Sequence, residues 1–261
     1  MADEFLRGTQ LIYRACNILR LFTRQQPEWS LIDVAHQVGL HPATAFRILQ
    51  AWTREGVLIQ DKRTGKYRLG YWLLKLGELA RQSNDLVRIA GAHAEKMAEK
   101  WGETTIVDVL DRRLQVLTVV FIPSSYRMAT NPNYDKPTPP HVIAGGKVLL
   151  ANLEVEKLDE FLGRELLAAT DRSITDPDKL RAELDKVREQ GYATNFEEQE
   201  IGFNAYAAPI RDASGQVVAA VSIGGPASRL TPERMPELVA AVMETSRAIS
   251  ADLGYEEVDS S

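Results

Sequence analysis

The sequence predicts an α+β protein with a small helical N-terminal domain and a larger C-terminal domain built on an antiparallel sheet. Two observations support this. Apolar residues recur with a helical period through most of the first 55 positions. Beyond residue 104, β-prone runs and helical segments are mixed without strict strand–helix alternation, which is typical of an antiparallel sheet. We place the domains at 1–70 and 84–255, joined by a helix at 71–83.

The chain of 261 residues is long enough for one or two domains, with 44% apolar and 26% charged residues, as in soluble globular proteins. No apolar run approaches the roughly 20 residues that cross a bilayer. The acidic start, Met1–Phe5, lacks the apolar stretch of a secretory signal. A single cysteine, Cys16, excludes an internal disulfide and a thiolate zinc cluster. We expect a cytoplasmic protein with no membrane partner.

The N-terminal domain begins with three predicted helices. The inner face of the first would consist of Leu11, Ala15, Ile18, Leu19 and Phe22. Ser30 is a suitable cap for the second, whose apolar stripe is Leu31, Val34, Ala35 and Val38. Gly39 would end this helix, and Pro42 would open the third. Two short helices around a tight glycine turn are typical of a helix-turn-helix motif, whose second helix enters the major groove of DNA.

In the third helix, Ala45, Ile48, Leu49 and Trp52 are expected to face inward. Small residues at its start would let the backbone approach base edges, and Arg47 and Gln50 have donors and acceptors that can reach them. The candidate DNA-binding residues of this segment are His41, Ala43, Thr44, Arg47, Gln50 and Arg54.

A β-hairpin should follow, because the β-prone runs 57–59 and 67–69 flank a turn in which Gly65 supplies a positive φ. The hairpin carries four basic residues that we assign to phosphate contacts: Lys62, Arg63, Lys66 and Arg68. A helical domain with a solvated charged turn is the plainer alternative. The order and spacing of the elements favour a winged helix-turn-helix domain that binds double-stranded DNA.

Charge is distributed unevenly along the chain. Residues 1–82 hold twelve Lys or Arg against seven Asp or Glu, a net charge of +5. The remaining residues hold nineteen against twenty-nine, a net charge of −10. The overall charge of −5 alone would argue against a nucleic-acid partner. The asymmetry instead fits a basic DNA-binding domain on an acidic body.

The segment Tyr71–Ala80 predicts a helix that is apolar on most of its circumference and must bury two faces. One face would pack on the N-terminal domain, and the other either on a partner subunit or on the second domain; both remain open. Dimerisation is expected independently, since paired domains reading two half-sites gain specificity from symmetry.

The C-terminal domain should start with a helix at 84–101, followed by strands at 104–110 and 114–122 and a possible further strand at 126–130. A proline-rich loop at 131–140 then leads into a helix that becomes regular near Gly146. Helices at 154–162 and 176–190, a hairpin of 204–210 with 216–224, and a last helix from Thr231 to near Gly254 complete the domain.

Catalytic and metal-binding motifs are not found. Gly145-Gly146-Lys147 lacks the other residues of a phosphate-binding loop, and the four histidines show no metal-ligand spacing. The acidic run Glu197–Glu200 reads as a solvated segment. We therefore expect no cofactor, no metal and no catalytic residue. An enzyme would need unpaired groups such as His141 and Lys147. The free N–H groups of Ala144–Gly146 at a helix start suit a carboxylate, although the glycines could equally serve close packing.

Several separated motifs resemble those of IclR-type bacterial transcriptional regulators, over almost the full length. They are residues 31–35, 43–49, 65–70, 140–141, 144–147, 150–151, 188–192, 197–202, 207–210 and 221–226. The resemblance implies a winged-helix domain, a linker helix that dimerises it, and a GAF-like domain that binds a small-molecule effector. Members of the family form dimers or tetramers and respond to small organic acids or aromatic compounds.

The resemblance also implies positions for the effector pocket: Met128, Ala144, Gly145, Gly146, Asn195, Ala205, Ser222 and Gly224. The glycine-rich helix start and Ser222 match the family pattern. Members that bind very small keto acids have a second serine, an aspartate and a small polar residue where this chain has Gly224, Asn195 and Ala205. A buried carboxylate needs its polar partners. We therefore expect a larger aromatic or catabolic acid, with its carboxylate at Ala144–Gly146 and apolar space where the polar groups are missing.

The sequence thus predicts a transcriptional regulator whose operator binding responds to an organic acid, either as a repressor or as an activator. The effector would shift the dimer between two arrangements through the helix at 71–81. The alternative from another class is a small-molecule-binding or enzymatic body with a vestigial DNA-binding domain.

Overall fold

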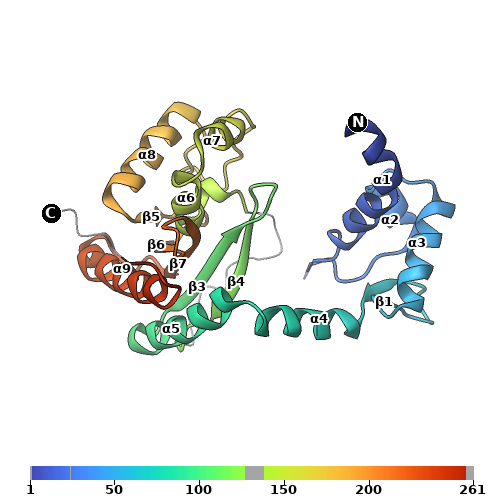
Figure 1. The fold of residues 1–261 in the computed structure, drawn as a ribbon, viewed down its shortest axis with the longest axis horizontal. Coiled ribbons are helices and arrows are strands. Elements are labelled where there is room, and N and C mark those ends of the chain that lie inside the picture. The colour runs from blue at the N-terminus through green and yellow to red at the C-terminus, as the bar shows by residue number, and fades with distance from the viewer. Residues whose placement is uncertain (1, 24, 127–137, 257–261) are drawn as a thin grey trace. The chain divides into compact units, whose positions relative to one another are not determined.

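The computed structural model describes residues 2–23, 25–126 and 138–256. The chain divides into two compact units, Met1–Ser83 and Asn84–Ser261 (Figure 1). In the described segments, no helix has the length and apolar character needed to span a membrane.

The first unit contains α1 (Ala2–Leu19), α2 (Leu31–Gln37), α3 (Pro42–Arg54), β1 (Leu58–Gln60), β2 (Tyr67–Leu69) and α4 (Tyr71–Gln82). Its buried core is formed by Ile18, Val34, Ala35, Ala45, Ile48, Leu49, Leu58 and Tyr67. The predicted inner face of the first helix is confirmed at Ile18 but wrong at Leu11, whose exposed fraction is 58%. The core cluster of this unit contacts α1 at Ala15, Ile18 and Leu19, and Leu11 lies beyond it.

Local signals in the sequence set the ends of α2 and α3. The Ser30 hydroxyl accepts a hydrogen bond from the Asp33 N–H at 3.2 Å, which satisfies a free donor at the start of α2. Gly39 has a φ of +63°, which glycine adopts without strain. The Ala43 N–H donates to His41 Nδ1 at 3.3 Å, and Pro42 is the first residue of α3. These caps confirm the predicted helix-turn-helix.

The hairpin of β1 and β2 is antiparallel, with Leu58 opposite Leu69 and Gln60 opposite Tyr67. The Asp61 carboxylate caps the turn by accepting the Arg63 and Thr64 N–H groups, each at 2.8 Å. These backbone hydrogen bonds, that of Thr64 first, lower the pKa of Asp61. Gly65 has the predicted positive φ, of +71°. The turn is therefore held by its own backbone, with its basic side chains exposed.

The second unit contains α5 (Asp85–Trp101), β3 (Thr104–Leu110), β4 (Val116–Ile122), a 3₁₀ turn (Pro140–Val142), α6 (Ala144–Ala151), α7 (Val155–Leu162), α8 (Pro177–Gln190), β5 (Ala193–Phe196), β6 (Phe203–Arg211), β7 (Val217–Pro226), a second 3₁₀ turn (Pro232–Arg234) and α9 (Met235–Asp252). The strands form one antiparallel sheet in the order β4-β3-β7-β6-β5. In Figure 1, α5 and α9 lie on one side of this sheet and α6, α7 and α8 on the other. The predicted α+β class is confirmed.

Strand alternation divides the sheet into two different faces. Large side chains, among them Val107, Tyr206 and Ile223, pack with residues of α5 and α9 in one core cluster. Small side chains, among them Ala205, Ala207 and Ala220, pack with residues of α6 and α8 in the other. The small residues let α6 approach the sheet closely. We call this second side the α6 face.

Three details of the second unit differ from the sequence-based expectations. Strand β5 is not expected, because its four residues, Ala-Thr-Asn-Phe, are too short and too polar to show a β pattern. Helix α6 begins at Ala144 rather than Gly146, and α9 follows a 3₁₀ turn at Pro232. The possible strand at 126–130 and the loop at 131–140 lie almost wholly outside the described residues.

Candidate nucleic-acid interface and effector site

The outer face of α3 carries the predicted base-reading residues. Arg47 and Arg54 are exposed, as are His41 and Ala43 at the start of the helix, and Thr44 is half-buried. The opposite face is buried at Ala45, Ile48 and Leu49. This exposed face, with small residues at its N-terminal end and arginines beyond them, suits insertion into a major groove.

Gln50 differs from the rest of that set. Its side chain is half-buried, and its Nε2 donates to the Tyr67 hydroxyl at 3.2 Å and to Gln60 Oε1 at 3.5 Å. Both partners belong to the hairpin. The expectation that Gln50 lies free on the outer face is therefore wrong, because its amide group is hydrogen-bonded to two side chains of the hairpin. Gln50 holds the wing against α3.

The wing presents its basic residues to solvent. Lys62, Arg63, Lys66 and Arg68 are all exposed, and none forms a salt bridge with a carboxylate of the described residues. Asp61, the acidic residue of the turn, accepts backbone N–H groups. The wing therefore offers positive charge beside α3, as phosphate contacts require.

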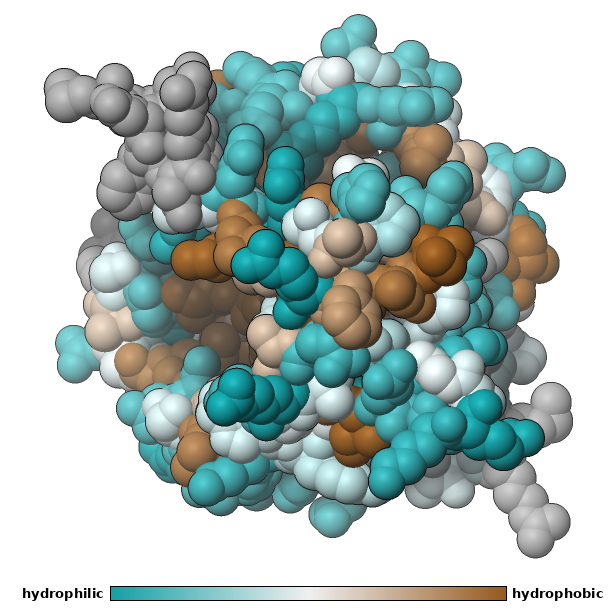
Figure 2. Space-filling model, turned by 90° about the vertical axis from the view of Figure 1, so that its right-hand side faces the viewer, coloured by the Kyte–Doolittle hydropathy of each residue, from teal (hydrophilic) through white to brown (hydrophobic). Residues whose placement is uncertain are grey.

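Helix α4 has no buried residue in the single chain. Its exposed large apolar side chains are Tyr71, Trp72, Leu74, Leu76 and Leu79, with exposed fractions from 39% to 70%. Figure 2 shows that hydrophobic residues, in brown, also reach the surface at several places on the face drawn there. A helix with this much exposed apolar surface is typical of an interaction surface.

The glycines at the start of α6 are required by close packing. A Cβ on Gly146 would lie 2.1 Å from the Pro140 carbonyl oxygen, and a Cβ on Gly145 would lie 2.9 Å from Asp108 Oδ2. A carboxyl group of the protein itself, that of Asp108, therefore lies beside the first turn of α6. This modifies the expectation that an effector carboxylate alone occupies the Ala144–Gly146 position.

The Asp108 side chain projects from β3 onto the α6 face and is 2% exposed. Its Oδ1 accepts a hydrogen bond from the Thr118 hydroxyl at 2.6 Å. Burial raises the pKa of Asp108 to about 7, while the Thr118 hydrogen bond acts in the opposite direction. Sequence reasoning misses this residue. The signal available is a charged residue inside the apolar run of β3.

Ser222 is a predicted pocket residue whose side chain remains available to a ligand. It is 4% exposed, lies opposite Ile106 and Ala207 on the α6 face, and its hydroxyl has no hydrogen-bond partner among the described residues. Ala144 and Ala205 are buried in the core cluster of the same face. The structure thus brings together Ser222, Ala205, Asp108 and the start of α6. Met128 lies outside the described residues.

The side-chain amide of Asn195 is hydrogen-bonded to backbone groups. Its Nδ2 donates to the Val142 carbonyl oxygen and its Oδ1 accepts from the Glu198 N–H, both at 2.9 Å. The side chain is fully buried. Asn195 therefore joins the segment before α6 to the loop after β5, instead of presenting a free amide to a ligand.

The expectation of apolar space beside Gly224 is wrong. A Cβ on Gly224 would lie 2.6 Å from Phe203 Cζ, so the phenyl ring already fills the volume that a serine side chain would take. Phe203 lies on the neighbouring strand β6 and is 5% exposed. The ring forms an apolar wall at this end of the α6 face.

A buried ionic cluster lies behind α6. Lys147, with a 1% exposed side chain, contacts Glu198 Oε1 at 2.7 Å and Glu183 Oε1 at 3.5 Å. Burial raises the pKa of Glu198, and burial followed by the Lys147 charge lowers the pKa of His141. His141 is 1% exposed. A sequestered lysine held by two carboxylates stabilises structure and is poorly placed for catalysis.

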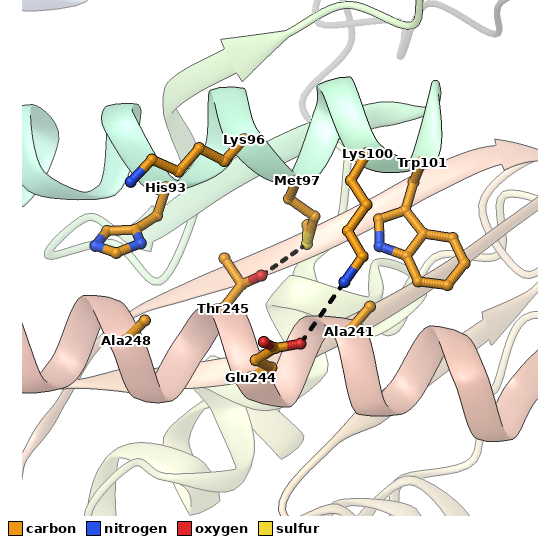
Figure 3. Close-up of a pocket in the computed structure, with 9 residues that line it drawn as sticks. All are labelled: His93, Lys96, Met97, Lys100, Trp101, Ala241, Glu244, Thr245 and Ala248. Atoms are coloured by element: carbon orange, nitrogen blue, oxygen red, sulfur yellow. Dashed lines mark hydrogen bonds and ion pairs between the residues drawn. The ribbon is translucent and has the colours of Figure 1, made fainter.

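A shallow groove lies between α5 and α9 (Figure 3). It contains a hydrogen bond from the Thr245 hydroxyl to Met97 Sδ at 3.2 Å and a 4.0 Å ion pair between Lys100 and Glu244. Its lining residues are His93, Lys96, Met97, Lys100, Trp101, Ala241, Glu244, Thr245 and Ala248. None of the predicted effector residues lines this groove.

A helix-turn-helix with a basic wing places the first unit among the DNA-binding domains of transcriptional regulators. Comparison with known proteins supports this class. The family model described as IclR helix-turn-helix domain matches residues 12–62, and the model described as bacterial transcriptional regulator IclR C-terminal matches residues 79–251.

Relatives align along nearly the whole chain. The glycerol operon regulatory protein of Streptomyces coelicolor is 36% identical over 251 residues, covering 95% of this chain and 98% of that protein. The HTH-type transcriptional regulator KdgR of Escherichia coli is 33% identical over 232 residues, which cover 88% of this chain and 88% of that protein. The crystal structure of an IclR homolog complexed with 4-hydroxybenzoate, from Microbacterium hydrocarbonoxydans, has a TM-score of 0.80 at 26% identity, covering 93% of this chain and 98% of that chain. The chain belongs to the IclR family of bacterial transcriptional regulators.

Proposed function

We propose that this regulator senses a small organic acid, aromatic or catabolic, on the α6 face beside the first turn of α6. The observation that carries this is the Ser222 hydroxyl, which has no hydrogen-bond partner among the described residues and lies on the same sheet face of small residues as Asp108. The Ser222 hydroxyl and one oxygen of the Asp108 carboxyl group have no hydrogen-bond partner among the described residues, so both can pair with polar groups of a ligand. The structure of an IclR homolog with 4-hydroxybenzoate supports this class of ligand.

A gel shift on the upstream region of its own gene, with and without candidate acids, tests this function. Calorimetry with the same acids measures direct binding. We expect an aromatic or catabolic acid to bind and to change operator affinity. Tight binding of glyoxylate together with no binding of any aromatic acid would overturn the proposal that the effector is larger than the very small keto acids. An absence of duplex binding at low salt would overturn the regulator itself.

We propose distinct roles for α3 and the wing on DNA. Lys66→Ala should weaken binding to all sequences similarly and lower the slope of log affinity against log salt by about one, because it removes one phosphate contact. Arg47→Ala should instead relax base preference at one position, at a cost of about 1–3 kcal/mol for a bidentate contact. Gel shifts across a salt series on operator and scrambled duplexes measure both effects.

Lys179→Ala is the matched control for that series, since it removes an exposed lysine from α8 in the second unit. It should leave both the salt slope and the base preference unchanged. A sequence-specific loss with Lys66→Ala, combined with a uniform loss with Arg47→Ala, would exchange the assigned roles.

We further propose a homo-oligomer, a dimer or a tetramer, in which the exposed apolar side chains of α4 pack against a second copy. In this proposal, residues 71–83 form the helix that links the domains 1–70 and 84–255. The effector would bind two arrangements of the oligomer unequally, since a ligand with equal affinity for both shifts nothing. We propose no catalytic role, since Lys147 is held by Glu198 and Glu183. DNA as partner implies a cytoplasmic location.

A further inference from the structure

The Asp108 carboxyl group has one satisfied oxygen and one unsatisfied oxygen. Oδ1 accepts from the Thr118 hydroxyl at 2.6 Å. Oδ2 has no hydrogen-bond partner among the described residues and lies beside the first turn of α6, where a Cβ on Gly145 would be 2.9 Å away. A carboxyl group that is 2% exposed and half-satisfied is costly unless a ligand or solvent completes it.

A β-bulge sets up this arrangement. The pairing of β3 with β4 shifts between Val107 and Asp108, so that Val107 faces Val120 while Asp108 faces Thr118. Without the shift, Asp108 would lie opposite the apolar Val119. Bulges commonly re-aim side chains next to functional sites. In this sheet the bulge brings a hydroxyl against one oxygen and leaves the other directed at α6.

In the part of the chain that the structure describes, few other charged residues lie on the elements around Asp108. Strands β4 and β7 have no ionisable residue, and Lys147 is the only one on α6. The Lys147 ammonium is held by Glu198 and Glu183. Close to α6, His141 on the 3₁₀ turn has a pKa lowered by burial. Among the described residues, Oδ2 is therefore an acceptor without a cation of its own.

We propose that Asp108 is a specificity-determining residue of the sensor, which accepts a hydrogen bond from a hydroxyl group of the effector. The inference rests on the proposed function and narrows its ligand to a hydroxylated organic acid. The acid group cannot lie beside Asp108 without like-charge repulsion. Asp108 pairs with Ala220 on β7, and Ser222, two residues from Ala220 on the same face, is a diagonal neighbour about 7–8 Å away whose hydroxyl can donate to the acid group.

The dependence of effector affinity on pH distinguishes two orientations of the ligand, one with its hydroxyl group facing Asp108 and one with its carboxylate facing Asp108. An ionised Asp108 accepts a hydroxyl hydrogen bond best, whereas a facing carboxylate requires Asp108 to be protonated. The pKa of Asp108 is raised to about 7. Affinity for a hydroxy acid should therefore rise by up to about tenfold from pH 6 to pH 8, while affinity for an acid whose carboxylate faced Asp108 would fall.

Calorimetric titration of the full chain with matched acids tests the proposal. The pairs are 4-hydroxybenzoate with benzoate and 3-hydroxypropionate with propionate, each at pH 6, 7 and 8. The wild-type protein should bind one hydroxylated member at least about tenfold more tightly than its partner, because a site built to bond a hydroxyl rejects the analogue that lacks it. Asp108→Ala should reduce this ratio to below about twofold and abolish the pH dependence.

Thr118→Val provides a second variant that keeps Asp108 in place. Removing the hydroxyl takes away the interaction that lowers the pKa of Asp108, so the rise in affinity should move to higher pH. A hydroxyl preference that survives Asp108→Ala overturns the proposal, as does wild-type affinity that falls between pH 6 and pH 8. Equal binding of both members of a pair overturns it while leaving the acid sensor intact. Binding of no acid overturns the sensor as well.

Discussion

Replacing Lys147 by methionine is expected to destabilise the second unit by about 3–5 kcal/mol. The ammonium group neutralises Glu198 at 2.7 Å, and the side chains are 1% and 10% exposed. Removing one partner of a buried ion pair leaves the other charge uncompensated, which is the costly way to break such a pair. Urea unfolding followed by hydrogen exchange on peptides from α6 and β6 would measure the loss in this unit alone.

Two further measurements separate lost charge from lost packing. The double variant Lys147→Met/Glu198→Gln should recover most of the stability, because the unpaired carboxylate is gone. Lys157→Met is the matched control: its ion pair with Glu154, at 2.9 Å, has side chains 58% and 71% exposed, so the change should stay within about 0.5 kcal/mol. Equal losses for Lys147→Met and Lys157→Met would contradict the account.

The deficit of Lys147→Met should also depend on pH. Burial already raises the pKa of Glu198, and removal of the ammonium raises it further. When the pKa of a carboxyl group is higher in the folded state than in the unfolded state, the free energy of unfolding falls as the pH rises from the lower pKa through the higher one. The variant should therefore be closest to wild type in mild acid and furthest from it above neutrality.

The helix caps and the turn of the first unit depend on local sequence and are predicted correctly. The Ser30 cap, the Gly39 turn and Pro42 at the start of α3 each depend on a few consecutive residues, and the structure confirms all three. Hydrophobic periodicity likewise predicts the helices and the long strands. These interactions need no knowledge of distant parts of the chain.

Apart from the exact starts of α6 and α9, the misses depend on contacts between distant segments. Gln50 turns toward the wing because Tyr67, seventeen positions later, offers its hydroxyl. Phe203 fills the place beside Gly224 only because β6 and β7 pair in their observed register. Strand β5 exists because β6 supplies its hydrogen bonds. Asp108 has no motif around it, and its setting is apparent only once α6 packs on the sheet.

Replacing Tyr67 by alanine is expected to abolish operator binding by unfolding the first unit. Tyr67 is 1% exposed at the centre of that core, and truncating a buried aromatic residue costs about 3–5 kcal/mol. The backbone hydrogen bonds of residue 67 with Trp29, at 2.8 and 2.9 Å, do not depend on the side chain, so the expected loss comes from the missing ring. Gel shifts would measure the operator affinity and calorimetry the effector affinity.

Tyr67→Phe is the matched control, because it keeps the ring and removes only the hydroxyl that accepts from Gln50. It should cost about 1 kcal/mol and leave operator binding measurable. Effector binding should persist in Tyr67→Ala, since Tyr67 belongs to the compact unit that ends at Ser83 and the α6 face to the other. Loss of effector binding together with operator binding would mean that the second unit cannot keep its fold when the first is lost. Unchanged operator affinity in Tyr67→Ala would mean that the wing keeps its place on α3 without this ring, which would contradict the packing argument for the DNA-binding surface.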